Sequence, residues 1–318
     1  MNKEIDDIFS DKNDDEITKE LKKKRKRYNS KLITKSISLT MAILLVLGLI
    51  LNVVSDKVIE RSFHKQSSIF YNEYTIMHPS EYIGERRYLE TGLFKSLTFF
   101  DIGKVVKEKV ISAGTRNLVS GIQFGSVGGI YPEHRNYTLE EDLAKRSYNT
   151  NGLRQLCFML PYVSYKNDIN DFRYLDEIDN NKYIEMVLSF DKEYSYEDVN
   201  KSFGSDNISF YWIDMSTDEQ KSYYEDEKAY LTENEVIGIK SITGEGKLIV
   251  DENGRLIQYR EAIAYLKDNK YRSHIEIRDG SYTNISGVVV QGTAEELKKL
   301  ESNSMIKHAI LGNIVDKF

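Results

Sequence analysis

A run of 20 residues without a charge, Ser36 to Ser55, constrains this chain more than any other feature. Its centre, residues 41–51, is unbroken apolar sequence. A helix of roughly 20 residues, rising about 1.5 Å per residue, spans a hydrocarbon core of about 30 Å. A buried core helix seldom lacks charge over such a length and seldom follows a basic flank. The sequence therefore predicts a transmembrane helix over 36–55.

The residues before this run indicate its orientation. Between Lys22 and Lys35 there are eight Lys or Arg residues and no Asp or Glu. The densest part of this flank is Lys22, Lys23, Lys24, Arg25, Lys26 and Arg27. The positive-inside rule predicts a single-pass cell-membrane protein with a cytoplasmic N-terminus and an extracellular C-terminal domain. A basic run can also bind nucleic acid, but its position beside the membrane favours topology and contact with anionic lipids.

A cleaved signal peptide is the main alternative for this segment. Its basic region would be about 35 residues long, and Asn52–Asp56 offers no pair of small residues for cleavage. We therefore favour an uncleaved signal anchor.

The charge of the remaining chain limits the kinds of partner it can bind, and its cysteine content limits the kinds of site it can form. Residues 1–35 hold 11 of the 44 Lys and Arg residues and 8 of the 50 Asp and Glu residues. The remaining 33 basic and 42 acidic residues give the outer region a net charge of −9. Nucleic acid is therefore a poor partner for it. Cys157 is the one cysteine, which excludes a disulfide framework and a multi-cysteine zinc site. In its apolar surroundings it is expected to be a small buried hydrophobe.

The tail, 1–35, is too short for a helix-turn-helix or a zinc-binding domain, but it carries two sets of apolar residues with helical spacing. Ile5, Ile8 and Phe9 form one set, and Ile17 and Leu21 form the other. So short a helix is marginal by itself in water. Two interpretations stay open: a tail that serves only as a topogenic signal, and one that folds into a partner's groove through these residues.

The outer region shows alternating strand and helix signals, strongest toward the C-terminus. Strands are predicted over 184–190, 208–214, 236–242, 247–250, 286–291 and 309–315, with a strand-like apolar run at 156–163. Helices are predicted over 56–74, as a stalk, and after the capping residues Thr138, Ser195, Thr217 and Thr293. Two strand–helix–strand units separated by an insertion predict an α+β fold, with a ferredoxin-like arrangement as the specific hypothesis.

A search for catalytic patterns gives no support for an enzyme or a cofactor. The five histidines are scattered without metal-ligand spacing, and neither a phosphate-binding glycine loop nor a nucleophile motif is present. Acidic clusters such as 176–179 lack the alternating spacing of a calcium loop. We therefore predict no catalytic, metal or cofactor residues, with an ectoenzyme acting on cell-wall material as the weakest of three hypotheses.

Several segments together resemble a known family, the membrane-bound anti-sigma factors of Gram-positive bacteria with paired sigma-regulator N-terminal and C-terminal domains. The N-terminal part of the resemblance is the basic stretch 20–35 that runs into the membrane helix, then 78–84 and 92–94. The C-terminal part is sharper and comprises 188–192, 194–198, 211–214, 286–297, Ile306 and 311–312. Residues 100–180 resemble the family least.

The resemblance implies a function that spacing alone does not indicate. Such proteins hold an extracytoplasmic-function sigma factor at the membrane through the cytoplasmic segment and release it when the outer domain senses envelope stress. It implies no catalytic residues. Release by proteolysis or by a conformational change stays open, and so does the involvement of a second small membrane protein or a protease as a further partner. It favours Ile5, Ile8, Phe9, Ile17 and Leu21 as sigma-factor contacts. The alternative is a cell-surface sensor or binding receptor with a purely topogenic tail.

The expected organisation has four parts. Residues 1–35 form the cytoplasmic tail and 36–55 the transmembrane helix. Residues 56–180 form a stalk and an N-terminal-type region, and 181–318 form the C-terminal-type α+β domain.

Overall fold

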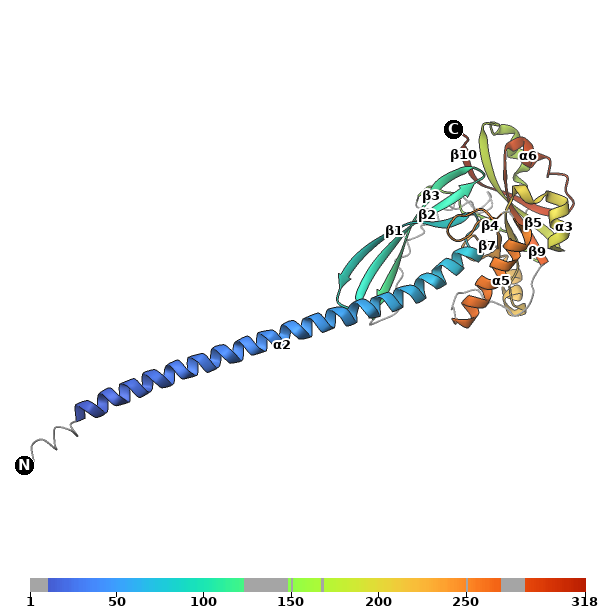
Figure 1. Ribbon diagram of the computed structural model, residues 1–318. Helices are drawn as coiled ribbons and strands as arrows, with labels where there is room; N and C mark the ends of the chain where they lie inside the picture. Colours follow the sequence, from blue (N-terminus) through green and yellow to red (C-terminus); the bar gives the residue numbers. More distant parts are fainter. Residues whose placement is uncertain (1–10, 123–147, 150, 167–168, 250, 270–283) are drawn as a thin grey trace, which may run out of the picture. The chain divides into compact units, whose positions relative to one another are not determined.

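The computed structural model describes residues 11–122, 148–149, 151–166, 169–249, 251–269 and 284–318 (Figure 1). The chain divides into two compact units, Met1–Val58 and Ile59–Phe318. The described part of the first unit is entirely helical, and the second unit combines helices with β-sheet. This mixture agrees with the predicted α+β class.

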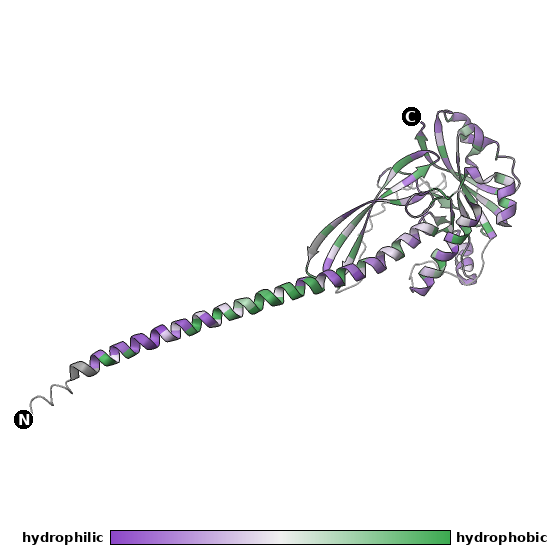
Figure 2. Ribbon diagram, in the orientation of Figure 1, coloured by the Kyte–Doolittle hydropathy of each residue, from purple (hydrophilic) through white to green (hydrophobic). Residues whose placement is uncertain are grey.

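Helix α2, Asp11–Ile76, contains the predicted membrane segment. Its apolar stretch is long and apolar enough to cross a membrane, and Figure 2 shows it as a hydrophobic band on the helix. Leu45 and Leu49 in this stretch are 69% and 68% exposed. A helix that is apolar on every side belongs in a protein core or a bilayer, and this stretch is not in a core. The helix therefore suggests single-pass membrane anchoring.

A five-stranded antiparallel sheet forms the centre of the second unit. Its strands are β5 (Lys182–Ser195), β6 (Ile208–Ile213), β8 (Ile237–Lys240), β9 (Asn284–Gly292) and β10 (Ile306–Asp316), in the order β10-β5-β9-β6-β8. Helix α3 (Tyr196–Phe203) connects β5 to β6, and α6 (Ala294–Lys298) connects β9 to β10. Both predicted strand–helix–strand units are present, and they interleave because β9 lies between β5 and β6.

The helices of these units begin at the caps that the sequence indicates. The Ser195 side chain accepts a hydrogen bond from the Asp198 amide at the start of α3. Thr293 and Glu296 form a reciprocal capping box at α6, and Thr217 and Gln220 form another at α4 (Asp218–Glu227). Each cap satisfies amide groups that the first turn of a helix leaves without partners.

One face of the sheet is covered by helices and is apolar. Alternate residues of β5, among them Met186 and Leu188, point into this core, as do Tyr211 of β6 and Val288 of β9. Helices α3, α5 (Glu252–Asp268) and α6 cover them, together with the 3-10 helix η1 (Asp171–Glu177). The period-2 alternation of a strand explains why Val187, between Met186 and Leu188, belongs to a different cluster.

That second cluster covers the opposite face and corrects one prediction. Leu156, Phe158 and Leu160 pack there against Val187 and Trp212. The run 156–163 was expected to be a strand, but only Cys157–Phe158 forms one, β4, paired with β7 (Leu231–Thr232). The segment is apolar because it is a buried cover of the sheet, and burial needs no strand geometry. Burial also raises the pKa of the Cys157 thiol to about 12, so this thiol stays protonated.

Other predictions need shorter bounds or lie outside the described residues. The strand expected over 236–242 is limited to β8, and 247–249 contributes one isolated bridge, Ile242 to Leu248, instead of a strand. Helix α5 was not predicted from the sequence. The helix expected after Thr138 lies outside the described residues.

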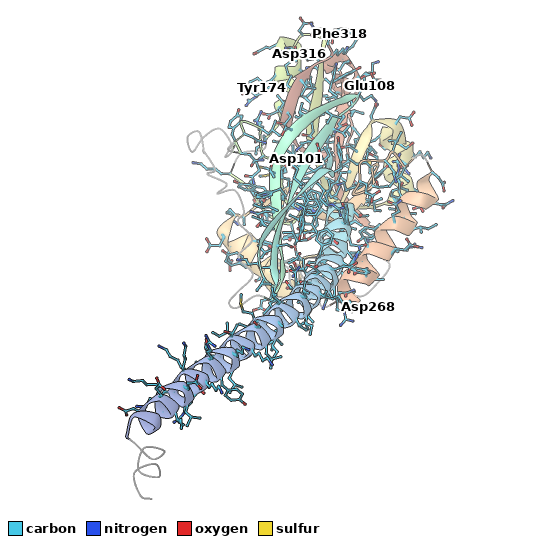
Figure 3. All side chains as sticks on the ribbon, turned by 60° about the vertical axis from the view of Figure 1, so that its left-hand side comes forward. Asp101, Glu108, Tyr174, Asp268, Asp316 and Phe318 are labelled. Carbon is cyan, nitrogen blue, oxygen red and sulfur yellow. The ribbon has the colours of Figure 1, made fainter. Side chains whose placement is uncertain are left out.

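A three-stranded antiparallel sheet precedes the larger one. It consists of β1 (Glu81–Gly92), β2 (Lys95–Val106) and β3 (Lys109–Gly121), in the order β1-β2-β3. Phe100 and Ile102 on its buried face pack with Ile83 and Tyr74, and Tyr74 lies near the end of α2. Asp101, which Figure 3 labels, lies on its solvent side. It accepts a hydrogen bond from the Arg87 guanidinium at 2.6 Å. We call residues 59–76 of α2, which belong to this unit, the stalk segment.

Candidate functional site: a buried charge cluster at the end of the stalk segment

The stalk segment ends in a tight turn, residues 77–81, which we call the stalk turn and which several contacts hold in place. Helix α2 ends at Ile76, and His78 and Ser80 then adopt left-handed backbone conformations, with φ of 53° and 63°. Such conformations are unfavourable for residues other than glycine and persist where the surroundings enforce them. The His78 ring stacks on Tyr74 with 4.5 Å between centroids, and its Nδ1 lies 3.2 Å from Asn234 Oδ1. The direction in which the chain leaves the helix is thereby fixed.

Lys240, at the end of β8, binds this turn through backbone oxygens. Its Nζ donates to the carbonyl oxygens of Tyr74 at 2.7 Å, His78 at 3.2 Å and Met77 at 3.3 Å, and also to that of Glu81. The Tyr74 carbonyl belongs to the last turn of α2, where carbonyl groups lack helical partners and the helix dipole favours a cation. One buried ammonium group therefore caps the helix and gathers the turn that follows.

The pKa of Lys240 reflects the cost of this position. Lys240 is only 2% exposed, and burial lowers its pKa to about 7. The negative charge of Glu81 opposes this change, and the positive charge of Lys104 adds to it. The proton on Lys240 is therefore held far less firmly than on a solvated lysine.

Lys104 forms the second half of the cluster. It lies on the buried face of β2, and its Nζ is 2.9 Å from Glu233 Oε2 and 3.2 Å from Glu185 Oε2. All three side chains are 2% exposed or less. Burial by itself lowers the pKa of Lys104, but the nearby carboxylates of Glu185, Glu233 and Glu81 outweigh burial, so the pKa is raised. Lys104 is therefore a firmly charged group that neutralises buried carboxylates.

We call Glu81, Lys104, Glu185, Glu233 and Lys240 the junction cluster. Three carboxyl groups and two ammonium groups leave one negative charge if all are ionised. Burial, and then the charge of Glu233, raise the pKa of Glu81, which favours its protonated form. The cluster links the stalk turn, β2, β5, β8 and the segment after β7. It can hold these parts together.

The sequence did not reveal this cluster, although it carried a signal. Lys104 alternates with Phe100 and Ile102 on an apolar strand face, and Lys240 ends the apolar strand β8. A lysine in the buried register of a strand needs an acidic partner or carbonyl groups. The partner of Lys104, Glu233, is 129 residues away, and sequence spacing cannot identify it.

The sequence-predicted contact residues lie elsewhere. Ile5, Ile8 and Phe9 are outside the described residues. Ile17 and Leu21 lie on α2, 56% and 61% exposed, and the six basic residues 22–27 on the same helix are also exposed. Their roles in sigma-factor binding and in topology stay predictions. Among the described residues, no group of three or more His, Cys, Asp or Glu side chains is placed to hold a metal ion.

Comparison with known proteins identifies one part of the chain. Residues 175–313 match the family described as sigma factor regulator C-terminal. The match supports an anti-sigma regulator family. The matched segment spans the five-stranded sheet, apart from the last residues of β10, and it includes Glu185, Glu233 and Lys240. The family is a regulatory, non-enzymatic class and implies a sigma-factor partner. No curated protein and no solved structure was found to match the chain.

Proposed function

We propose that the chain is a membrane-anchored anti-sigma factor. It sequesters an extracytoplasmic-function sigma factor through residues 1–35 and releases it when the outer domain responds to envelope stress. The observation that carries the proposal is the sigma-regulator match at 175–313, in a chain whose apolar helix could cross a membrane.

The charge pattern supports a cytoplasmic tail. Basic residues 22–27, followed by Lys31 and Lys35, precede the apolar stretch, as the positive-inside rule requires for the cytoplasmic side. Ile17 and Leu21, one helical turn apart, are exposed and available to a partner. A sigma factor that covers them removes apolar surface from water, and each Å² of buried apolar surface contributes about 25 cal/mol of favourable free energy. Residues 1–35 then serve as the binding segment, and 36–55 as the anchor.

The junction cluster supports a role for the stalk segment in release. Lys240 lies within the matched residues 175–313, and it binds the Tyr74 carbonyl near the end of the stalk segment and the Met77 carbonyl just after it. Any change in β8 or in the charge of Lys240 acts directly on the end of that helix.

The division of the outer region into two domains, 56–180 and 181–318, is part of this proposal. The strand order β10-β5-β9-β6, antiparallel throughout, supports a ferredoxin-like description of the C-terminal domain.

Co-purification tests the tail. The full-length chain is extracted from membranes in mild detergent, and bound sigma factor is identified by mass spectrometry. Ile8→Asp with Phe9→Asp is expected to abolish binding, because charged side chains cannot enter an apolar groove. The matched control, Ser10→Asp with Asn13→Asp, adds the same charge without removing an apolar residue and should retain binding. Equal recovery of sigma factor with all three chains would contradict the tail's role and favour a surface receptor with a topogenic tail.

Cysteine labelling tests the topology. The single native cysteine, Cys157, is buried, so a membrane-impermeant maleimide should leave the parent chain unlabelled on intact cells. Glu197→Cys, at an exposed position of α3, is expected to label from outside, and Lys19→Cys only after lysis. The reverse pattern would place the sigma-regulator domain in the cytoplasm and contradict the proposal.

A further inference from the structure

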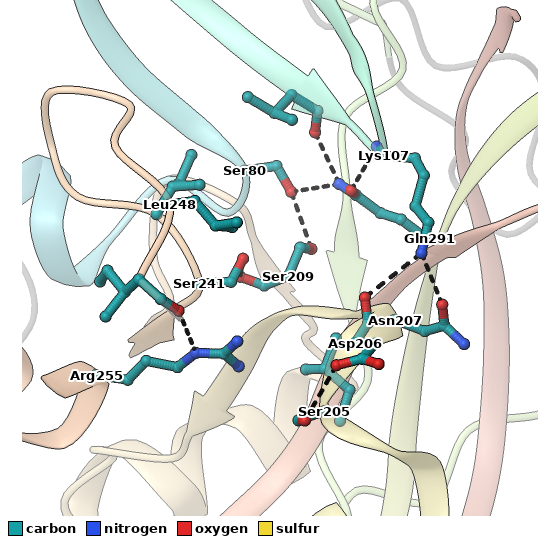
Figure 4. Close-up of a pocket in the computed structure, with 14 residues that line it drawn as sticks. Ser80, Lys107, Ser205, Asp206, Asn207, Ser209, Ser241, Leu248, Arg255 and Gln291 are labelled. Carbon is teal, nitrogen blue, oxygen red and sulfur yellow. Dashed lines mark hydrogen bonds between the residues drawn. The ribbon is translucent and has the colours of Figure 1, made fainter. Parts of the chain in front are cut away.

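A pocket of about 310 Å³ lies beside the stalk turn and is not part of the junction cluster (Figure 4). Its walls come from the stalk turn, the β2–β3 turn, the 3-10 helix η2 (Ser205–Asn207), the loop after β8, the first turn of α5 and β9. The volume suits a small organic molecule. Both polar side chains and apolar ones, such as Ile242 and Leu248, line it.

Arg255 is the unusual residue of this pocket. It lies in α5 and is 7% exposed, and its Nε donates to the Ile249 carbonyl at 3.1 Å. Its Nη1 is buried without a hydrogen-bond partner among the described residues. In Figure 4 the guanidinium group points toward the side of the pocket that holds Ser205 and Asp206. A buried charged donor without a partner is costly, so its presence at a pocket requires an explanation, and a bound anion that accepts its hydrogen bond is one.

The remaining charges of the pocket are arranged around this group. The Nζ of Lys107 donates to Asn207 Oδ1 at 2.8 Å, which places a second cation on the opposite wall. Asp206 is the one carboxylate among the described residues that line the pocket, and its side chain is at an exposed position. Two cations and one carboxylate give the lining a net positive charge, whereas the whole chain has a net charge of −6. The buried end of the pocket therefore favours an anion.

We propose that this pocket binds an organic oxyanion, a carboxylate or a phosphate ester, with the Arg255 guanidinium as its buried contact. A guanidinium group presents planar paired donors that match the oxygens of either group. The apolar residues Ile242 and Leu248 contact the organic part of the ligand. Lys107 adds attraction from the pocket wall.

Hydrogen bonds connect the pocket to the stalk turn. Gln291 donates to Ser80 Oγ at 2.9 Å and to the Val105 carbonyl at 2.7 Å, and it accepts from the Lys107 amide at 2.6 Å. Ser80 Oγ in turn donates to Ser209 Oγ at 3.1 Å. A ligand in the pocket therefore contacts Ser80 and Gln291, which help to position the turn at the end of the stalk segment. Its use as a signal rests on the proposed function, whereas the binding itself does not.

Titration calorimetry on the full-length chain in detergent tests the binding. The probes are benzoate, phenyl phosphate and inorganic phosphate, which separate a carboxylate site, a phosphate-ester site and a site for the free ion. At least one of the two organic probes is expected to bind saturably, and more tightly than inorganic phosphate. Arg255→Gln should weaken this binding about tenfold or more, because one charge-assisted pair is lost. Arg260→Gln, an exposed arginine on the same helix, is the matched control and should bind as the wild type does.

Arg255→Lys keeps the buried charge and decides the case if Arg255→Gln does not fold. It should melt as the wild type does and still bind the organic probe several-fold more weakly, because an ammonium group lacks the paired donors. No saturable binding of either organic probe below about 10 mM, or binding that is unchanged in a folded Arg255 variant, would overturn the proposal. Failure here with intact sigma-factor recovery would leave the proposed function standing.

Discussion

The two faces of the five-stranded sheet are both buried, but they are built differently. The helix-covered face is almost entirely apolar, with Met186, Leu188 and Val288 at its centre. The opposite face combines apolar residues such as Val187 and Trp212 with the charged Glu185 and Lys240. Its charged part meets β2 and the stalk turn. An apolar face stabilises the domain whatever lies beyond it, whereas a charged face depends on a specific partner.

Removal of the central cation should have the largest effect on the charged face. Lys104→Met leaves Glu185 and Glu233 buried beside each other without a positive charge. The free energy of unfolding should fall by about 3–5 kcal/mol, as for other buried pairs that lose one partner. Urea denaturation of the full-length chain in detergent measures it. Adding Glu185→Gln and Glu233→Gln to Lys104→Met should restore much of the loss, and no recovery would mean that packing is the cause.

The apolar face should respond to lost volume and not to charge. Leu188→Ala removes buried methyl groups from the helix-side core and should cost about 2–5 kcal/mol in the free energy of unfolding. This loss should be the same between pH 6 and pH 9 by urea denaturation, because no ionisable group is affected. A loss that changes with pH would show that the two faces are coupled.

Lys240→Met should act more locally than either change. It leaves the carbonyl groups of Tyr74, Met77 and His78 without their buried donor, at a cost of about 1–3 kcal/mol. Hydrogen exchange should accelerate over 74–84 and stay unchanged in β5 and β9. Uniform acceleration across the domain would contradict a role of Lys240 in holding the stalk turn.

The same residue should make stability depend on pH. Burial lowers the pKa of Lys240 in the folded state to about 7, below the ordinary lysine pKa of 10.5 that applies to the unfolded chain. Between these pH values the unfolded state binds more protons, so this group's contribution rises with pH, by at most about 1.4 kcal/mol per unit. As pH falls toward 7, this contribution of Lys240 to the free energy of unfolding decreases again. Below pH 7 both states hold the proton, and the contribution no longer changes with pH. The stability of the wild type relative to Lys240→Met should therefore increase from pH 7 to pH 9 in urea denaturation, and a decrease would refute the assignment.

The strands of the apolar face and two of its helices were predictable from the sequence, whereas helix α5 and the charged face were not. Strand β5 and helices α3 and α6 followed from apolar runs and from the caps Ser195 and Thr293, because these signals are local. Strand β1 escaped prediction because its sequence, with Glu85, Arg86 and Arg87, has few apolar residues and one face open to solvent. The junction cluster depends on pairs more than 100 residues apart, such as Lys104 with Glu233, which only the tertiary fold brings together.

Transcription from a sigma-dependent promoter tests the central claim most directly. Cells carry the promoter fused to a reporter, together with the full-length chain or its Ile8→Asp, Phe9→Asp variant at equal membrane levels. The proposed function predicts low expression with the wild type and with the Ser10→Asp, Asn13→Asp control, and high expression with the Ile8→Asp, Phe9→Asp variant. Repression by that variant as complete as by the wild type would contradict sequestration through the tail.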